Sequence, residues 1–318
     1  MTLKVVFRKY ASLDGKTKNL VERVSDGSII KRFDRTPLPK SRNDVICPHF
    51  LELKWAYGCP FNCAWCYLKG TLRRCPEKTK PIVKDFNRIE KHLNSFFDIK
   101  TIPEILNSGE ITDSLWYENN GNSFSKFIIP KFEESDKGHK ILFLTKSTNI
   151  KNILSMKPNG YSIMSFSLNA EEVSKRWEKA PSIKNRIKAA AELFNIGCHV
   201  RARIDPMVPI QDWEKHYMNL VDLIFSNFEP ERITIGSLRG LNSTIGQAKD
   251  KSWVKYLSES SNWGRKIEFN LRRKMYLTII NYLRESYKFK KVALCKETKE
   301  MWESLKLNYK DMKCNCTF

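Results

Sequence analysis

Three cysteines stand close together in the segment YGCPFNCAWCYLKG, with the spacing C-x3-C-x2-C. Cys59, Cys63 and Cys66 could together bind one soft metal ion or one iron–sulfur cluster, because thiolates are the preferred ligands of both. A [4Fe–4S] cube has four irons, so three cysteines leave one iron open to a ligand from outside the protein. The alternative is a zinc site completed by His49 or Cys75, and the spacing alone leaves both open.

Polar side chains follow four of the short apolar runs that read as β-strands. The carboxyl ends of parallel strands meet at one edge of a sheet, where barrel enzymes carry their chemistry. A carboxylate there can bind an ammonium, a lysine can bind a carboxylate, and neutral groups can bond to a ribose. The candidate cofactor-binding residues at these ends are Gly109, Glu110, Lys146, Ser167, Asn169 and Arg203. For Glu110, a solvated surface turn is the alternative.

The elements that position these residues alternate along the chain. The β-like runs are 50–55, 103–108, 140–145, 161–168, 199–204 and 232–237, and the amphipathic helical segments are 124–134, 150–156, 170–196, 213–228 and 271–287. Within the third helical segment, Pro181 is expected to start a new helix at Ser182. Six β-α units in series predict an α/β fold with a parallel sheet that curls into a partial (β/α)6 TIM-like barrel.

The chain divides into three parts by composition. Residues 1–44 are basic and are predicted to form an irregular arm, residues 45–240 form the barrel, and residues 241–318 form a helical extension. That extension carries Cys295, Cys314 and Cys316.

The cysteine loop, with Trp65 directly before its third cysteine, resembles the signature of the radical S-adenosylmethionine (SAM) superfamily. The resemblance implies that Cys59, Cys63 and Cys66 hold a [4Fe–4S] cluster whose open iron binds SAM. Reduction by an electron donor such as flavodoxin or ferredoxin then yields a 5′-deoxyadenosyl radical that abstracts hydrogen from a substrate. It also implies that Gly109 and Glu110 bind the amino group of SAM, and Trp65 is a further candidate for cofactor binding.

Residues 45–240 resemble the spore photoproduct lyase branch in four segments. These are CxxxCxxCYLK, NSGEITDSL, LTKS and SFSLNAEEVSKRWEKAPSIKNRIKAA. The resemblance implies repair of a thymine dimer in DNA, in which a protein cysteine returns a hydrogen atom to the substrate. In the family that cysteine lies in the strand end that here reads Gly109 to Asp113, where Glu110 or a neighbour replaces it. Since a carboxylate O–H bond is too strong for this donation, we expect a relative with a different reaction.

The cysteines outside the loop allow three interpretations. Cys295, Cys314 and Cys316 could hold an auxiliary iron–sulfur cluster or another metal, with Cys47, Cys75 or a substrate group as fourth ligand. One of them could be the missing hydrogen donor or a redox-active thiol. The third possibility is a frayed terminus with incidental cysteines. We name Cys316, Cys314 and Tyr67 as catalytic candidates; Tyr67 could stack on adenine or on an extruded base, or only shield the cluster.

The net charge of +21 favours a nucleic acid as partner over a lysine-rich surface that merely solvates the protein. No apolar run approaches the ~20 residues of a membrane span, and the first residues lack a signal-peptide core, so we expect a cytoplasmic protein without a membrane partner. Two other functions stay open. One is a radical SAM enzyme for a peptide or small metabolite with an auxiliary cluster, and the other is a zinc-stabilised nucleic-acid-binding module. The sequence does not indicate the oligomeric state.

Overall fold

The N-terminal segment forms a sheet. The computed structural model describes residues 2–36, 38–75, 80–118 and 121–318. Strands β1 (Val5–Ala11), β2 (Thr17–Val24) and β3 (Ile30–Phe33) are antiparallel, and β3 pairs with β5 (Phe50–Leu53). The prediction of an irregular arm was therefore wrong for these strands. Apolar side chains such as Val21, Val24 and Ile30 are fully buried, whereas basic ones such as Lys18 and Lys31 stay exposed.

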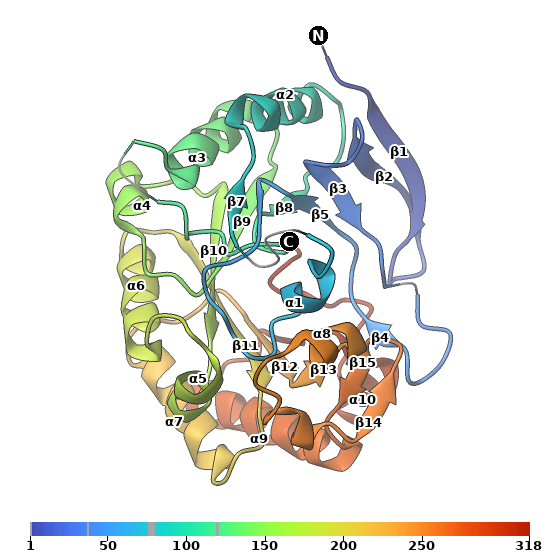
Figure 1. Cartoon of the computed structure of the whole chain (residues 1–318), viewed down its shortest axis with the longest axis vertical. Coiled ribbons are helices and arrows are strands. Elements are labelled where there is room, and N and C mark those ends of the chain that lie inside the picture. The colour runs from blue at the N-terminus through green and yellow to red at the C-terminus, as the bar shows by residue number, and fades with distance from the viewer. Residues whose placement is uncertain (1, 37, 76–79, 119–120) are drawn as a thin grey trace.

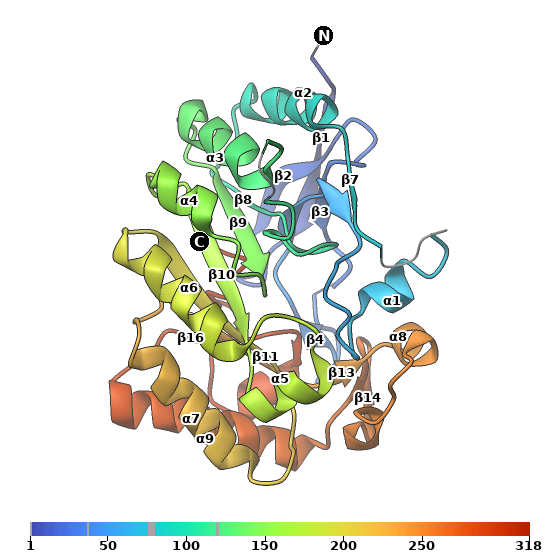
Figure 2. The same ribbon diagram turned by 60° about the vertical axis from the view of Figure 1, so that its left-hand side comes forward.

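The central sheet confirms the predicted partial barrel. All six predicted runs form parallel neighbours in chain order (Figure 1), and β16, labelled in Figure 2, adds a seventh strand beyond residue 240. After β5 the strands are β8 (Ile105–Asn107), β9 (Lys140–Thr145), β10 (Ser162–Leu168), β11 (His199–Met207), β12 (Ile233–Ser237) and β16 (Val292–Leu294). The C-terminal part is thus no separate extension, because one of its strands completes the barrel sheet.

Helices cover the outer surface of this sheet (Figures 1 and 2). They are α2 (Phe86–Phe97), α3 (Phe124–Ser135), α4 (Lys151–Met156), α5 (Glu171–Trp177), α6 (Ile183–Asn195), α7 (Trp213–Phe225) and α9 (Phe269–Tyr287). The Ser182 hydroxyl accepts a hydrogen bond from the Asn185 amide at 3.3 Å, so the expected start of a new helix after Pro181 is confirmed. Helix α2 was not predicted.

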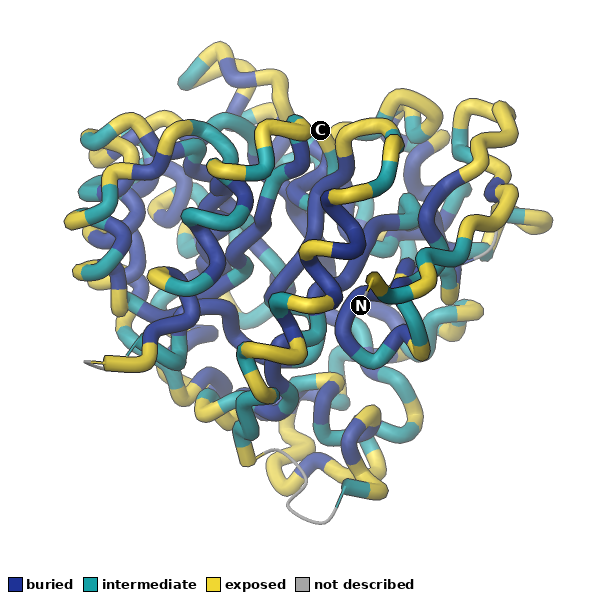
Figure 3. The backbone as a smooth tube through the Cα atoms, turned by 90° about the horizontal axis from the view of Figure 1, so that it is seen from above, coloured by how far each residue is buried: buried dark blue, intermediate teal, exposed yellow. Residues whose placement is uncertain are grey.

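Short elements fill the connections between these layers. They are β4 (Val45–Ile46), β6 (Ala56–Tyr57), α1 (Leu68–Thr71), β7 (Ile82–Val83), β13 (Arg239–Gly240), α8 (Asn242–Gln247), a 3-10 helix η1 (Val254–Tyr256), β14 (Glu259–Ser261), β15 (Gly264–Lys266), β17 (Glu297–Thr298) and α10 (Lys299–Ser304). The pair β4–β17 joins the segments beside β5 and β16. Buried residues occupy the interior of the molecule, and exposed residues lie at its periphery (Figure 3). Within the described residues, no helix combines the length and apolar character that a membrane crossing requires.

The C-terminal tail packs against the strands of the barrel through Asn315, and in the view of Figure 1 the C-terminus projects onto the middle of the ring of strands. The buried side chain of Asn315 bonds to three strands: to Ser165 on β10 at 2.7 Å, to the Ala202 carbonyl on β11 at 3.0 Å and to Thr234 on β12 at 2.7 Å. Arg201 donates to the Asn315 carbonyl at 2.8 Å. The tail is therefore an ordered part of the barrel core, which contradicts the frayed terminus.

Asn315→Ala is expected to destabilise the protein, because it removes the buried side-chain hydrogen bonds to Ser165, to the Ala202 carbonyl and to Thr234. The expected loss is about 1–3 kcal/mol of unfolding free energy, measured by urea denaturation followed by circular dichroism. Asn308→Ala is the matched control, since Asn308 is exposed on the same C-terminal segment. Equal stability of the two variants would contradict this account of the tail.

His139 predicts a pH dependence of stability. Its ring is buried, and its Nδ1 accepts a hydrogen bond from the Glu104 amide at 3.0 Å. Burial lowers the pKa of His139 from 6.5 to about 4, so the unfolded chain takes up the proton first as pH falls. The contribution of the neutral, buried His139 to the free energy of unfolding is fully present above pH 6.5 and is lost as pH falls towards 4. The free energy of unfolding, measured with urea at several pH values, should fall less steeply between pH 6.5 and 4 in His139→Gln than in wild-type protein. The same slope in both proteins would contradict this role of His139.

Candidate active site

A pocket of about 460 Å³ opens at the carboxyl ends of the strands. Residues from the cysteine loop, from the segment after β8, from β9 to β11, from β3 and β5 and from the turn between β14 and β15 line it together. Of the candidates predicted from the sequence, the pocket brings together Cys63, Trp65, Cys66, Tyr67, Gly109, Glu110, Lys146, Ser167 and Arg203. These residues span some 140 positions of the chain, so the barrel assembles the site.

The cysteine loop runs between β6 and α1 and is anchored at both sides. The Ala64 amide donates to the Trp177 carbonyl at 2.8 Å, and the Lys69 ammonium donates to the Cys63 carbonyl at 2.8 Å. The Trp65 ring packs against that of Trp177, with centroids 5.6 Å apart. Helix α5 thereby fixes the loop against the barrel.

The loop carries the thiolate donors that an iron–sulfur cluster requires. Cys59, Cys63 and Cys66 are all free thiols, and Cys63 and Cys66 face the pocket. Among the described residues, no three His, Cys, Asp or Glu side chains lie close enough to hold one metal ion. His49, a suggested zinc ligand, packs against Tyr10 at 5.1 Å in the N-terminal part.

Lys146 is held in the pocket wall by a buried acid that the sequence interpretation missed. Its ammonium lies 3.0 Å from Glu178 Oε1, and Arg186 Nη1 lies 2.8 Å from Glu178 Oε2. Burial alone would raise the pKa of Glu178, but Lys146 and Arg186 together hold it below its ordinary value. Glu178 stands in the segment SKRWEKAPS, and nothing local in that segment marks it as the partner of Lys146.

The strand end after β8 is packed tightly against β9. A Cβ atom on Gly109 would lie 2.6 Å from the Cβ of Leu144, so only glycine fits there. Asp113 closes the turn by accepting hydrogen bonds from the Lys146 amide at 2.7 Å and the Thr145 hydroxyl at 2.8 Å. Glu110 lies on the pocket wall with its carboxylate 3.7 Å from the Lys296 ammonium.

Arg203 belongs to a second buried cluster of charges. Asp205 lies 3.1 Å from Arg203 and 2.8 Å from Arg239, and the Cys295 sulfur lies 2.6 Å from Arg203 Nη2. Burial would raise the pKa of Asp205, but the two guanidinium groups hold it well below its usual range. Arg239 was not among the predicted residues.

Ser167 and Asn169 have different places. Ser167 lines the pocket, whereas Asn169 is fully buried behind it and does not line it. The Asn169 side chain donates to the Pro206 carbonyl at 2.9 Å and accepts from the Tyr217 hydroxyl at 3.0 Å. Asn169 therefore fixes the strand ends around the pocket.

Four thiols line a second, small cavity beside the pocket. Cys47, Cys295, Cys314 and Cys316 surround about 30 Å³, and this cavity shares Glu110, Arg203 and Lys296 with the larger pocket. The neighbouring Cys314 thiol and burial raise the pKa of the Cys316 thiol. The Cys316 sulfur lies 3.9 Å from Asn107 Nδ2 at the end of β8. The barrel thus brings the tail cysteines together with Cys47 and Cys295 next to the candidate active site.

The model of one protein family, Spore photoproduct lyase, matches residues 51–236, which carry the cysteine loop and the strand ends described above. The chain belongs to the spore photoproduct lyase family. The spore photoproduct lyase of Bacillus subtilis is 26% identical over 184 residues, which cover 54% of this chain and 49% of that protein. The one from Clostridium acetobutylicum is 25% identical over 175 residues, covering 54% and 50%. The chain thus spans about half the length of these curated relatives.

Solved structures support the same fold. A spore photoproduct lyase complexed with dinucleoside spore photoproduct has a TM-score of 0.62 at 16% identity, covering 77% of this chain and 75% of that one. Streptococcus suis SuiB bound to precursor peptide SuiA has a TM-score of 0.52 at 14% identity, covering 75% and 46%. At these identities the likeness concerns the fold, a partial barrel that the spore photoproduct lyase family shares with SuiB.

Proposed function

We propose that this member of the spore photoproduct lyase family is a radical SAM enzyme that repairs or modifies a nucleic acid. The observation that carries the proposal is the convergence of Cys63, Cys66, Glu110 and Lys146 on one pocket at the strand ends. Bound there, a [4Fe–4S] cluster with SAM on its open iron would supply the 5′-deoxyadenosyl radical that abstracts a hydrogen atom from the substrate.

The residues of the chain take the following roles. Cys59, Cys63 and Cys66 hold the cluster, and Gly109 allows close approach of the backbone. Glu110 and Lys146 face the charged amino and carboxylate groups of SAM, while Ser167 offers a hydrogen bond. Trp65 and Arg203 form part of the pocket walls, Asn169 fixes the strand ends behind the pocket, and Tyr67 lines the same pocket.

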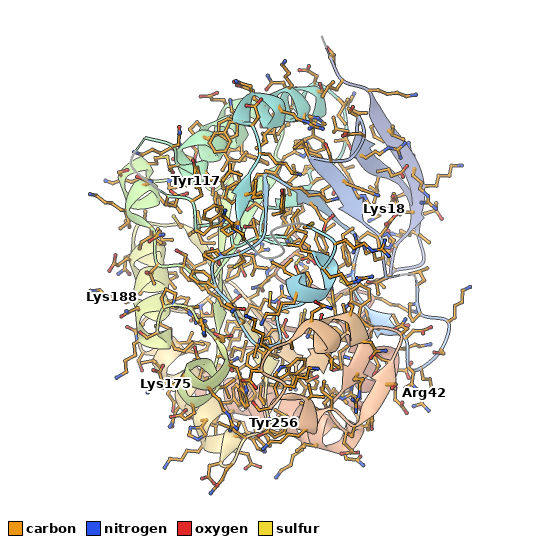
Figure 4. The ribbon with its side chains drawn as sticks, viewed as in Figure 1. Lys18, Arg42, Tyr117, Lys175, Lys188 and Tyr256 are labelled. Atoms are coloured by element: carbon orange, nitrogen blue, oxygen red, sulfur yellow. The ribbon has the colours of Figure 1, made fainter. Side chains whose placement is uncertain are left out.

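A polyanionic substrate fits the charge of the pocket and of the surface. The described pocket lining carries more basic than acidic side chains: Arg35, Lys54, Lys146, Arg203, Arg239 and Lys296 against Glu52, Glu110 and Asp205. Figure 4 places Lys18 and Arg42 on one side of the molecule and Lys175 and Lys188 on the other, so the surface excess is spread widely. A solved family member is complexed with a dinucleoside photoproduct.

The hydrogen donor is proposed to be Cys316. A substrate carbon radical needs a weak X–H bond, and among protein groups the thiol supplies one whereas a carboxyl group such as that of Glu110 does not. Cys316 lies beside Asn107 and lines the cavity that includes Glu110, at the end of β8. In the transfer the S–H bond breaks, a C–H bond forms on the substrate, and the unpaired electron moves to sulfur. The neighbouring Cys314 thiol lines the same cavity.

The substrate class is tested by the binding of labelled single-stranded and double-stranded DNA and RNA, measured by fluorescence anisotropy over a range of salt concentrations. We expect the logarithm of the association constant to fall steeply and linearly with the logarithm of the salt concentration, since phosphate contacts release counterions. Ultraviolet-irradiated DNA is then incubated with cluster-loaded protein, SAM and reductant, and the photoproducts are measured. No affinity for any of these nucleic acids would reject the proposal in favour of a peptide or small-metabolite substrate.

A further inference from the structure

Lys296 lies at the boundary between the pocket and the thiol cavity and lines both. Its ammonium lies 4.4 Å from the ring centroids of Phe33 and Trp263 and 3.7 Å from the Glu110 carboxylate. Its carbonyl accepts a hydrogen bond from the buried Lys266 ammonium at 2.8 Å. The backbone of Lys296 is therefore fixed, and the ammonium at the end of its flexible stem is the part that can change partners.

The pair of Glu110 and Lys296 is partly buried, with 15% and 13% of the two side chains exposed. In such a site the attraction between charges is stronger than in water, and a charge that loses its partner is costly. A ligand that takes only Glu110 leaves Lys296 unpaired, and a ligand that takes only Lys296 leaves Glu110 unpaired. Exchange is favourable when both side chains obtain new counter-charges together.

SAM and a nucleic acid offer the two complementary charges: SAM has an ammonium and a sulfonium, and the nucleic acid has phosphates. We propose that Lys296 couples the binding of SAM and substrate, because a cationic group of SAM takes Glu110 and releases the Lys296 ammonium to a substrate phosphate. The rings of Phe33 and Trp263 keep the released ammonium at the pocket wall through cation–π attraction. This inference rests on the proposed function and specifies how its two ligands communicate.

Thermodynamic linkage makes the coupling reciprocal, so SAM raises the affinity for the nucleic acid by the same factor as the nucleic acid raises the affinity for SAM. The size expected for such coupling is about 5- to 150-fold. A role of Lys296 limited to structure would alter stability but would not make the affinity for one ligand depend on the other.

The experiment uses cluster-loaded protein without reductant, so that SAM stays intact. The dissociation constant of a fluorescent DNA oligonucleotide is measured by anisotropy with and without SAM. Wild-type protein should bind at least about fivefold tighter with SAM. In Lys296→Gln this factor should fall to about one, and the salt slope measured with SAM should decrease by about one. Glu110→Gln should bind the oligonucleotide without SAM as tightly as wild-type protein does with it.

Lys299→Gln is the control, because Lys299 pairs with Glu303 at 3.8 Å on α10, outside the pocket, and should keep the coupling. If wild-type protein binds the oligonucleotide with the same dissociation constant with and without SAM, the proposed role of Lys296 is overturned and the proposed function still stands. Coupling that persists in Lys296→Gln would also overturn it. No binding of the oligonucleotide by wild-type protein would overturn both.

Discussion

Replacing Cys316 with alanine is expected to stop conversion of the substrate while cleavage of SAM continues. The substituted side chain lies outside the large pocket, in the cavity next to it, so the binding of SAM should survive. Without the thiol the substrate radical has no donor, and conversion should fall to the level of a control without enzyme. Both products, 5′-deoxyadenosine and converted substrate, are quantified in the same reaction by liquid chromatography.

Cys314→Ala is the matched control, because Cys314 stands two residues away and is more deeply buried. Conversion should be retained in that variant and lost in Cys316→Ala. Deuterium from solvent should enter the product through the exchangeable thiol in wild-type protein. Full conversion by Cys316→Ala, or loss of 5′-deoxyadenosine in parallel with conversion, would reject Cys316 as donor.

Replacing Glu178 with alanine is expected to cause the largest loss of stability. The side chains of Glu178 and Arg186 are fully buried, and that of Lys146 is 17% exposed, so the substitution leaves two cations without their acid. Breaking a buried ion pair in this way costs about 3–5 kcal/mol. The free energy of unfolding is measured by urea denaturation of the protein without cluster, and SAM affinity is measured after reconstitution.

Glu171→Ala gives the comparison, since Glu171 pairs with Lys175 at 3.4 Å on the exposed side of the same region. An exposed pair of this kind contributes about 0–1 kcal/mol. A similar small effect of both substitutions would show that Glu178 is dispensable for the fold and for holding Lys146.

The parts of the fold that the sequence predicted are those with a local signal. The runs at 140–145 and 161–168 are rich in apolar residues because most of each strand is buried, and the three cysteines of the loop lie within eight residues. Segment 1–44 lacked such a signal, because its strands mix apolar residues with charged ones and show no regular alternation: β2 contains Lys18, Glu22 and Arg23, and β3 contains Lys31 and Arg32.

The site was predictable only in part for a similar reason. Strand ends such as Gly109 and Lys146 are adjacent to recognisable runs, so their place at the pocket followed from the topology. The ion-pair partners of the strand-end residues lie far away in the chain: Glu178 pairs with Lys146, and Lys296 pairs with Glu110. The tail enters the barrel through contacts of one asparagine, Asn315, with three strands. Pairings across such distances depend on packing that no local pattern encodes.

The central claim is that the cysteine loop holds a SAM-cleaving cluster. We would purify the protein without oxygen, reconstitute it with iron and sulfide, count iron per chain, and then add dithionite and SAM. We expect about four irons bound through the loop and formation of 5′-deoxyadenosine, both lost in Cys63→Ser. A count near eight that falls in a Cys295/Cys314/Cys316 triple variant would add an auxiliary cluster. Bound zinc in place of iron, with no 5′-deoxyadenosine, would contradict the account.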